Sequence, residues 1–515
     1  MIENFRILLI NPPYPGKPYI KSLGLGYLAS SLEKENFSIK IIDEEVFGSF
    51  KKNVKQIIAK AKSYKPNLIG ISLHTPYVRY AYYLIKELKK NISSTFLVAG
   101  GIHSFLYAEE VLKYGIDIAI IGEGELTILE LVKALRENKN IESIFGLAYK
   151  KSNGEIFFSG KRSFISNLDL IPFPSLPQSL IKTHTQNRYN GQLITSRGCP
   201  GECTFCSSKI MGKKYRFRSA ENIFKEMLYL YDEFKVNYFL FMDDTFTFDI
   251  KRCEKLCNLI IRESNFNPNW TSASIAKGIT KNLLKLMKMA GCTSIILGIE
   301  TFNHQTIKNI KKNIEFDKVR EIVDICDKIK LSLQLNIMTG FPFENEKKIY
   351  TTLNALKEIS PKVKYFSTGS VLVPYPGTEI YEEYKIGKGF VNWWLKDNFS
   401  QDPIKHDYCP YFLNGLLGDF TMPKDPILDI NFFNYSKKEI KAMKKLLFYK
   451  CIHSMKSSYG LIKIIILFFL YYFSKVLYKF SPFIENYIFS NLYKIFLRFK
   501  RRVNNEKIFK IHEKN

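Results

Sequence analysis

The most informative stretch of the chain is Thr195-Ser-Arg-Gly-Cys-Pro-Gly-Glu-Cys-Thr-Phe-Cys206. Its cysteines, Cys199, Cys203 and Cys206, have the spacing C-x3-C-x2-C. Because iron–sulfur clusters are held by cysteine thiolates, three thiolates on one short loop can bind three irons of a cubic cluster. The fourth iron then has no protein ligand and stays open to a substrate. The loop therefore predicts a [4Fe-4S] cluster that meets a small molecule directly.

Other cysteine chemistries fit this chain less well. A structural zinc site normally takes four ligands, often as two C-x2-C pairs, and no second pair follows Cys206. Cys253 and Cys257 lie four residues apart in a predicted helix, where we expect two small, half-buried side chains. The 515 residues contain only nine cysteines and begin without a secretory leader, which argues against a disulfide framework. We therefore expect a cytoplasmic protein, which suits an oxygen-sensitive cluster.

Strand and helix patterns alternate on both sides of the cysteine loop. From about residue 5 to 138, five short apolar runs alternate with amphipathic stretches, which predicts an α/β domain with a doubly wound, Rossmann-like parallel sheet. From about 191 to 398, several strand patterns end in acidic or glycine residues, among them Asp243, Glu300 and Gly340. Such repeated strand–helix units predict a parallel barrel with its ligands at the carboxyl ends of the strands.

A chain of this length is too long for a single hydrophobic core, and its patterns divide it into four segments. We assign 1–140 to the doubly wound domain and 189–400 to the barrel. Between them, 141–188 contains a hairpin, whose tight turn is Asn153-Gly154, and a proline-rich connector. The last segment, 401–515, is basic and aromatic, and we expect it to be helical.

The cysteine loop resembles the cluster loop of the radical SAM enzymes, which share C-x3-C-x-aromatic-C, with Phe205 in the aromatic position. The resemblance implies a partial (β/α)6 TIM-like barrel. It also implies a cluster that binds S-adenosylmethionine (SAM) and cleaves it reductively to a 5′-deoxyadenosyl radical. By this resemblance, the residues around SAM are Phe205, Asp243, Glu300 and Gly340. A helix cap or an ion pair remains the alternative role for each of the two acids.

Two positions depart from the pattern of that family. Gly340-Phe-Pro-Phe-Glu344 resembles a family motif in which a glycine stands at the place of Phe343. Ile275 stands where relatives often carry an arginine. One polar contact near SAM or the substrate is therefore missing from the expected set.

The first domain resembles the cobalamin (B12)-binding domain that precedes many radical SAM cores. The matching motifs are Asn11-Pro-Pro13, Leu23-Gly-Leu-Gly-Tyr-Leu-Ala29, Gly100-Gly-Ile-His103 and Gly122-Glu-Gly-Glu125. The resemblance implies cobalamin beyond the carboxyl ends of the strands, where doubly wound sheets bind their ligands. The residues that we expect to contact it are Pro13, Leu25, Ser72, Gly100, Gly101 and Glu123.

One departure in the first domain concerns the cobalt ion. The Asp-x-His-x-x-Gly loop that supplies a lower histidine ligand in many B12 domains is absent, and no histidine precedes His74. Bound cobalt would therefore lack that ligand. For His74 and His103 we expect structural or hydrogen-bonding roles.

The two resemblances together imply a cobalamin-dependent radical SAM enzyme that methylates a carbon of a small-molecule or lipid-like substrate. Radical cyclisation, rearrangement or oxidation with the same cofactors is the alternative reaction class. RNA modification ranks lower, because it rests only on the positive charge and the C-terminal tail has no recognisable RNA-binding module. Cleavage of SAM requires an external one-electron reductant of the flavodoxin or ferredoxin type.

The charge of the chain is concentrated at its carboxyl end. The net charge is +27, and residues 437–515 contain 18 lysines and arginines against four glutamates. Such an excess favours an anionic partner. The uncharged run Ile464–Phe473 is too short to span a bilayer, but basic residues among Phe, Tyr and Leu suit a helix at the inner membrane surface.

Helices packed on the core or on a second copy are the alternative for this tail, and nucleic acid is the least favoured partner. We expect truncation at about Ser436 to leave cluster binding intact.

Overall fold

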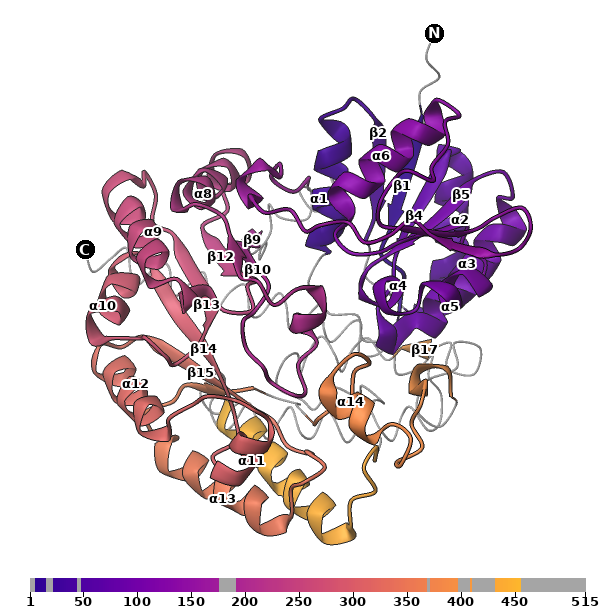
Figure 1. The fold of residues 1–515 in the computed structure, drawn as a ribbon. Coiled ribbons are helices and arrows are strands. Elements are labelled where there is room, and N and C mark those ends of the chain that lie inside the picture. Colours follow the sequence, from indigo (N-terminus) through magenta and orange to yellow (C-terminus); the bar gives the residue numbers. More distant parts are fainter. Residues whose placement is uncertain are drawn as a thin grey trace.

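The computed structural model describes residues 5–14, 22–43, 48–175, 191–367, 371–396, 408–409 and 431–454 of the chain. It contains two α/β domains that lie side by side (Figure 1). The first domain is coloured indigo to purple, and the second runs from magenta to orange. Each domain is built on a sheet of parallel strands, as the sequence patterns predict.

The first sheet has seven strands in the order β2-β1-β4-β5-β6-β7-β8. Its first five strands are parallel, and the chain runs from β1 to β2 on one side and to β4 on the other, so the order reverses at β1. The parallel strands are β1 (Arg6–Ile10), β2 (Ser38–Ile42), β4 (Leu68–Ser72), β5 (Phe96–Gly100) and β6 (Ile118–Ile120).

Helices cover both faces of this sheet, because the strands are apolar on both sides. Ile7 and Leu9 of β1 pack on one face with α1 (Leu23–Glu33) and α6 (Gly124–Arg136). Leu8 and Ile10 pack on the other face. The helices of that second face include α2 (Phe50–Tyr64), α3 (Val78–Asn91) and α5 (Ala108–Lys113). Short α4 (Ile102–Leu106) follows β5.

The predicted hairpin is present and extends the first sheet. It consists of β7 (Leu147–Lys150) and β8 (Ile156–Phe158), and Gly154 in its turn has a φ of +88°. β7 pairs antiparallel with β6. The first domain therefore reaches to Phe158, beyond the boundary at residue 140 that the sequence suggested, because the hairpin supplies the hydrogen bonds that the edge of β6 needs.

The second sheet has six parallel strands in the order β16-β15-β14-β13-β12-β9. The strand order follows the chain order, as in an open barrel, which confirms the partial (β/α)6 fold. Its strands are β9 (Gly191–Leu193), β12 (Tyr238–Phe241), β13 (Asn269–Ser274), β14 (Cys292–Glu300), β15 (Ser332–Ile337) and β16 (Tyr365–Phe366). Between them run α8 (Ala220–Phe234), α9 (Ile250–Glu263), α10 (Lys281–Met289), α11 (His304–Asn309), α12 (Phe316–Lys328) and α13 (Glu346–Ile359).

A helix from the carboxyl end of the described chain closes the edge of this sheet. Residues 437–454 are helical, and the yellow helix of Figure 1 lies beside α13. The Ser454 hydroxyl donates to the carbonyl of Phe366 (2.8 Å) and accepts from its N–H (3.0 Å). These are the groups that a further strand next to β16 would have bonded. The first part of the predicted tail is therefore part of the barrel.

The apolar run Ile464–Phe473 and the basic stretches after it lie outside the described residues. Within the described part of the chain, no helix combines the length and the apolar content that crossing a bilayer requires.

Candidate functional site

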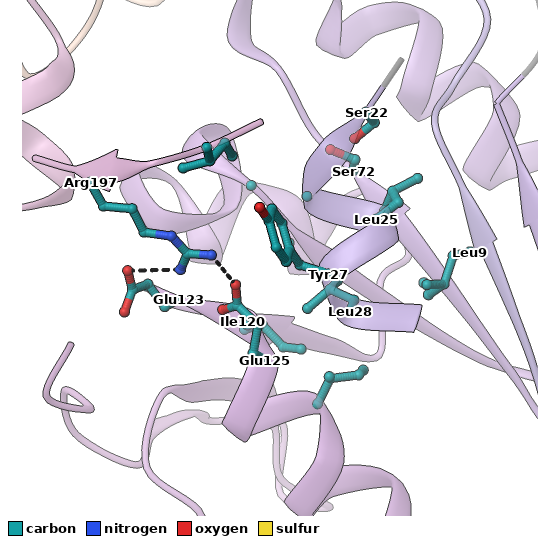
Figure 2. A pocket seen from close by; sticks show the side chains of 18 of the residues that line it. Leu9, Ser22, Leu25, Tyr27, Leu28, Ser72, Ile120, Glu123, Glu125 and Arg197 are labelled. Carbon is teal, nitrogen blue, oxygen red and sulfur yellow. Dashed lines mark hydrogen bonds and ion pairs between the residues drawn. The ribbon is translucent and has the colours of Figure 1, made fainter. Parts of the chain in front are cut away.

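A cavity of about 370 Å³ lies where the two domains meet. The first domain lines it with the ends of β1, β4, β5 and β6 and with the beginnings of α1 and α6. The barrel lines it with Ser196, Arg197 and Gly198, directly before the first cysteine of the loop, and with Asp244 beyond β12. In Figure 2, Tyr27 lies between Arg197 on the left and Leu25 and Leu9 on the right, and all four line the cavity.

Five of the six residues expected to contact cobalamin line this cavity, and Pro13 is not among the lining residues. The five are Leu25, Ser72, Gly100, Gly101 and Glu123. A methyl group built on Gly100 or on Gly122 would meet no atom within 4 Å, so the turns after β5 and β6 border open space. At Gly101, where φ is +96°, such a methyl group would lie 2.8 Å from the carbonyl oxygen of Leu73. Glycine is therefore needed there to let the turn pack on the neighbouring strand.

The three loop cysteines are free and half-buried. They follow β9 and the short strand β10 (Ser196–Arg197). Burial raises the pKa of the Cys199 and Cys203 thiols, and the neighbouring thiols raise it further. A methyl group on Gly201 would lie 3.3 Å from Cys199 Sγ and 4.0 Å from Cys203 Sγ, so this glycine keeps the inside of the loop clear.

Such a loop fits a cubic cluster better than it fits a single ion. Within the described residues, no three Cys, His, Asp or Glu side chains converge on one metal position. A cubane does not need that convergence, since each cysteine binds a different iron. The three sulfurs instead have to surround the space that the cluster would occupy. Gly201 has no side chain that would fill the space beside Cys199 Sγ and Cys203 Sγ.

The cysteine loop is held from two sides. The Thr204 N–H donates to the carbonyl of Ile310 after α11 (3.1 Å). The Ile380 N–H of α14 (Glu379–Tyr384) donates to the carbonyl of Thr204 (3.1 Å). Phe205 packs edge-on against Phe341, with the ring centroids 5.7 Å apart. The structure thus brings Phe205 next to the turn at Gly340.

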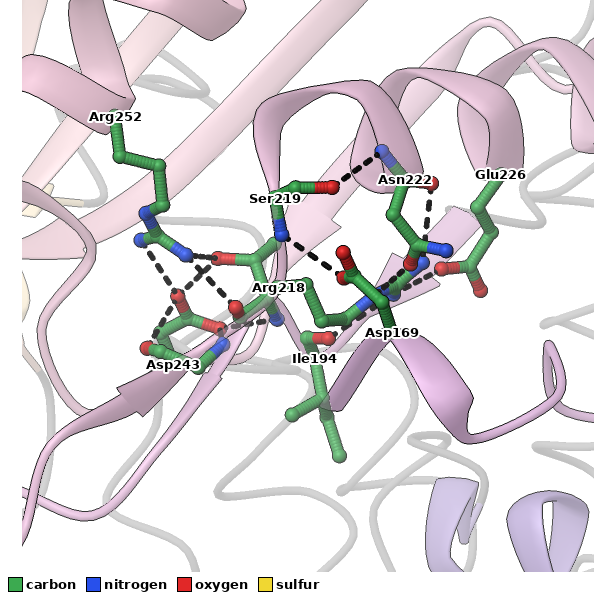
Figure 3. Close-up of polar contacts among 10 residues, drawn as sticks. Asp169, Ile194, Arg218, Ser219, Asn222, Glu226, Asp243 and Arg252 are labelled. Atoms are coloured by element: carbon green, nitrogen blue, oxygen red, sulfur yellow. Dashed lines mark hydrogen bonds and ion pairs between the residues drawn. The ribbon is translucent and has the colours of Figure 1, made fainter. Parts of the chain in front are cut away.

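Asp243 has a supporting position beneath the loop (Figure 3). Its carboxylate accepts the N–H groups of Thr195 (2.6 Å) and Ser196 (3.0 Å) and both of their hydroxyl groups. Arg252 lies 3.7 Å away. These internal contacts correspond to the ion-pair alternative for Asp243. Its neighbour Asp244 lines the cavity instead and accepts from Ser208.

A second polar network in Figure 3 joins the strand before the loop to the first helix of the barrel. Arg218 donates to the carbonyl of Ile194 (3.2 Å) and forms an ion pair with the buried Glu226 of α8. The Ser219 hydroxyl caps α8 by accepting the Asn222 N–H. Residues 194–196 are therefore held on both sides, which positions the loop that follows.

Glu300 lies at the end of β14, with a φ of +70°. Lys312 Nζ donates to its carboxylate at 2.7 Å. A methyl group on Gly298 would lie 2.8 Å from Glu300 Oε1 and 3.0 Å from Lys312 Nζ, so this glycine makes room for the pair. Burial opposes the charge of Lys312, but Glu300, Cys203 and Cys206 outweigh it and raise its pKa.

The turn at Gly340 is held by the buried Glu344 and the partly buried Tyr435. Glu344 accepts the N–H groups of Gly340 (2.8 Å) and Phe341 (3.2 Å), and burial raises the pKa of its carboxyl to about 7. The Tyr435 hydroxyl donates to the carbonyl of Gly340. Three residues earlier, at the end of β15, Lys450 Nζ donates to the carbonyl of Ile337 (2.5 Å). The helix of residues 437–454 thus contacts β15, the strand that precedes the Gly340 turn.

Sequence reasoning missed Lys312, Tyr435 and Lys450. Lys312 is one of two adjacent lysines in a polar stretch, and nothing nearby marks it. Tyr435 and Lys450 lie about 100 residues beyond the groups they bond. No local pattern joins such distant segments.

His74 and His103, which follow β4 and β5, are not among the residues that line the cavity, and their surroundings differ. His103 is fully buried, and its ring nitrogens lie 3.0 Å from Tyr82 Oη, 3.1 Å from Glu110 and 3.1 Å from Thr75. This agrees with the hydrogen-bonding role expected for it. His74 Nε2 lies 3.5 Å from the Ser72 hydroxyl.

Known proteins match both halves of the site. A model of the radical SAM superfamily matches residues 193–356, and a model of the B12 binding domain matches residues 17–132. An uncharacterized methyltransferase of Pyrococcus horikoshii, PH0819, is 32% identical over 408 residues, which cover 75% of this chain and 85% of that protein. The match therefore extends over both domains.

More distant relatives share the architecture. The anaerobic magnesium-protoporphyrin IX monomethyl ester cyclase of Synechocystis is 24% identical over 69% of this chain and 73% of its own. Among solved structures, the radical SAM methyltransferase TsrM of Kitasatospora setae, with cobalamin and a [4Fe-4S] cluster bound, superposes with a TM-score of 0.62. It is 18% identical over 75% of each chain, a likeness that shows a shared fold.

Proposed function

The chain belongs to the radical SAM enzymes that carry an N-terminal B12-binding domain, and from this premise we propose that it is a cobalamin-dependent C-methyltransferase. One observation carries the proposal. The cavity at the strand ends of the first sheet is bordered by Arg197 and Gly198, the two residues before Cys199. A ligand in the cavity therefore lies next to the cysteine loop, so a cobalt centre and a cluster can act on one substrate.

Cys199, Cys203 and Cys206 would hold the [4Fe-4S] cluster, and the five cavity residues from the first domain would contact cobalamin. When bound, the cluster supplies the electron that cleaves SAM, and cobalamin supplies a metal that can carry a methyl group. Among the described residues that line the cavity there is no histidine. Cobalt would accordingly have no histidine ligand from this wall.

Residues at the carboxyl ends of β14 and β15 would bind SAM. The Glu300 carboxylate can accept hydrogen bonds from ribose hydroxyls or from the amino group of SAM. Lys312 holds this carboxylate in place and adds a cation beside the loop. Glu344 and Tyr435 fix the backbone of the Gly340 turn. Glycine is needed there because its φ is +85° and a methyl group would lie 3.0 Å from Val371 Cγ1. Phe205 would shield the cluster on the side of that turn.

The substrate that we propose is a small or lipid-like molecule, and the electron comes from a flavodoxin- or ferredoxin-type donor. We propose that the protein works in the cytoplasm. Contact of residues beyond 454 with the inner membrane surface remains part of the proposal, supported by the basic and aromatic composition of that segment.

The test begins with anoxically purified protein, reconstituted with iron and sulfide and analysed for iron and cobalt. It is then incubated with a one-electron reductant, an anoxic small-molecule and lipid extract of the source cells, and SAM labelled in its methyl group. We expect 5′-deoxyadenosine and a product that contains the label. Cys203→Ala should abolish both the cluster absorbance and SAM cleavage, whereas Cys326→Ala, on α12 away from the loop, should retain them.

Two results would contradict the proposal. SAM cleavage in the Cys203→Ala protein would show that the cluster ligands are wrong. A product without the label would favour cyclisation, rearrangement or oxidation, a reaction class that the cyclase among the relatives makes the second candidate.

A further inference from the structure

Four charged side chains join the two domains at the wall of the cavity. Arg197 donates to Glu123 Oε1 (3.0 Å) and to Glu125 Oε1 (2.5 Å), as the dashed lines of Figure 2 show. Arg216 lies opposite Arg197 in the ribbon formed by β10 and β11 (Arg216–Phe217). It donates to both oxygens of Glu123, at 2.9 Å and 3.0 Å. We call these four residues the interdomain clamp.

The clamp is largely removed from solvent. The exposed fractions of the side chains are 17% for Arg197, 5% for Arg216 and 8% for each glutamate. Burial opposes ionisation of Glu123, but the hydrogen bonds from Arg216 and the charge of Arg197 outweigh it and lower its pKa. The two arginines and the two glutamates therefore carry equal and opposite charge, and water screens their attraction weakly because they are buried. Such a pair network specifies geometry more strongly than an exposed ion pair does.

Each half of the clamp is attached to one of the two proposed cofactor sites. Glu123 is the N-cap residue of α6 and Glu125 lies in its first turn, and the neighbouring Gly122 and Gly124 line the cavity. Arg197 also lines the cavity and stands two residues before Cys199. A displacement of the turn would therefore change the position of the residue that leads into the cysteine loop.

We propose that the interdomain clamp couples the cavity to the cysteine loop, so that filling either site favours binding at the other. This inference rests on the proposed function. All four members line the cavity, and Glu123 is also one of the proposed cobalamin contacts. The role proposed for Glu125, Arg197 and Arg216 is that of positioning residues, which hold the start of α6 against the strand before the cysteine loop. Coupling between two binding sites is reciprocal and is commonly 5- to 150-fold in affinity. We expect the clamp to confer a difference of about tenfold, near the lower part of that range.

The test measures hydroxocobalamin affinity of the full-length protein by anoxic titration, with and without the reconstituted cluster. In the wild type, we expect the cluster to tighten cobalamin binding about tenfold. In Glu125→Gln, the affinity should be the same in both forms. Arg197→Lys is a second variant, because lysine keeps the charge but cannot bridge two carboxylates. Glu221→Gln, which breaks an exposed ion pair with Lys255, is the matched control and should behave as the wild type.

The outcomes separate the inference from the function on which it rests. Cobalamin binding that is indifferent to the cluster in the wild type would overturn the coupling and leave the proposed function standing. Full coupling in both Glu125→Gln and Arg197→Lys would also overturn the role of the clamp. Absence of cobalamin binding in the wild type would overturn the proposed function and the inference with it.

Discussion

Asp243 and Asp244 are neighbours in the chain, yet their carboxylates have different surroundings. Successive residues leaving a strand point in opposite directions. Asp243 turns beneath the loop, where Thr195 and Ser196 supply four donors. Asp244 turns toward the cavity and receives one hydrogen bond from Ser208. At the scale of the residue, one acid supports the site and the other faces it.

We predict that Asp243→Asn destabilises the protein more than Asp244→Asn does. Asparagine has a single acceptor oxygen and no charge, and hydrogen bonds to charged groups contribute about 1.5–3 kcal/mol each. Asp243→Asn should lower the free energy of unfolding by at least about 2 kcal/mol, and Asp244→Asn by less than about 1 kcal/mol. Urea unfolding of the cluster-free proteins, followed by circular dichroism, measures both. Equal losses would contradict the supporting role of Asp243.

Lys450 is a lysine whose burial predicts that the stability of the protein depends on pH. Its side chain is fully buried, and burial lowers its pKa from 10.5 to about 7. Between pH 7 and 10.5 the unfolded chain binds a proton that the folded protein has lost. Stability therefore rises with pH across this window and falls as the pH drops toward 7.

We predict that Lys450→Met removes this pH dependence. Methionine removes the Lys450 donor from the Ile337 carbonyl, which keeps only the longer hydrogen bond from the Ser367 hydroxyl (3.4 Å). This loss costs about 1–3 kcal/mol at every pH. Relative to the wild type, the variant should gain a few kcal/mol on going from pH 10 to pH 7, because one pKa unit corresponds to about 1.4 kcal/mol. Urea unfolding at several pH values tests this. Parallel stability curves for the two proteins would refute the shifted pKa.

At the scale of the element, the helix of residues 437–454 replaces a missing strand neighbour. It buries Ala442, Met443, Leu446 and Leu447 against the barrel. Burial of a large apolar side chain contributes about 1.5–3 kcal/mol. The sum is comparable to the whole stability of an ordinary domain. A cut at about Ser436, which on sequence grounds is expected to spare cluster binding, would therefore remove part of the core.

Two truncations separate the helix from the chain beyond it. Removal of residues 437–515 should expose the edge of β16 and yield protein that aggregates or fails to retain iron. Removal of residues 455–515 keeps the helix with Lys450 and Ser454, and should retain more of the cluster. Iron content and size-exclusion profiles of the two proteins provide the comparison. Equal iron content in both would show that the helix is dispensable.

At the scale of the whole molecule, the two domains are joined on more than one side of the cavity. The interdomain clamp lies at one wall. Elsewhere, the indole N–H of Trp394, in the second domain, donates to the carboxylate of Glu110 in the first domain (3.2 Å). The Trp394 ring also packs edge-on against the buried His103. A short antiparallel pairing of Tyr408–Cys409 with Gly48–Ser49 adds a further contact. Because both domains are held, the strand ends of the first sheet keep facing the cysteine loop.

Much of this arrangement could be predicted from the sequence. The cysteine spacing, the alternation of strands and helices, and the glycine turns after β5 and β6 are local patterns. Local patterns report which groups a short segment can offer and where its backbone must bend. They correctly indicated two α/β domains. The resemblance to the B12-binding domain led to five residues that line the cavity, and their contact with cobalamin stays a prediction. Pro13 is the expected residue that the described cavity does not include.

The amino-acid sequence specifies the functional groups: three thiols on one loop, acids at strand ends, and glycines at the turns. Which side chains meet one another follows from the folded arrangement of the two domains. Glu123 and Arg197 are 74 residues apart, and Lys450 is 113 residues from the carbonyl that it bonds. Such partners are selected by packing and by the burial of charge, which depend on distance in space and leave no mark in either segment alone.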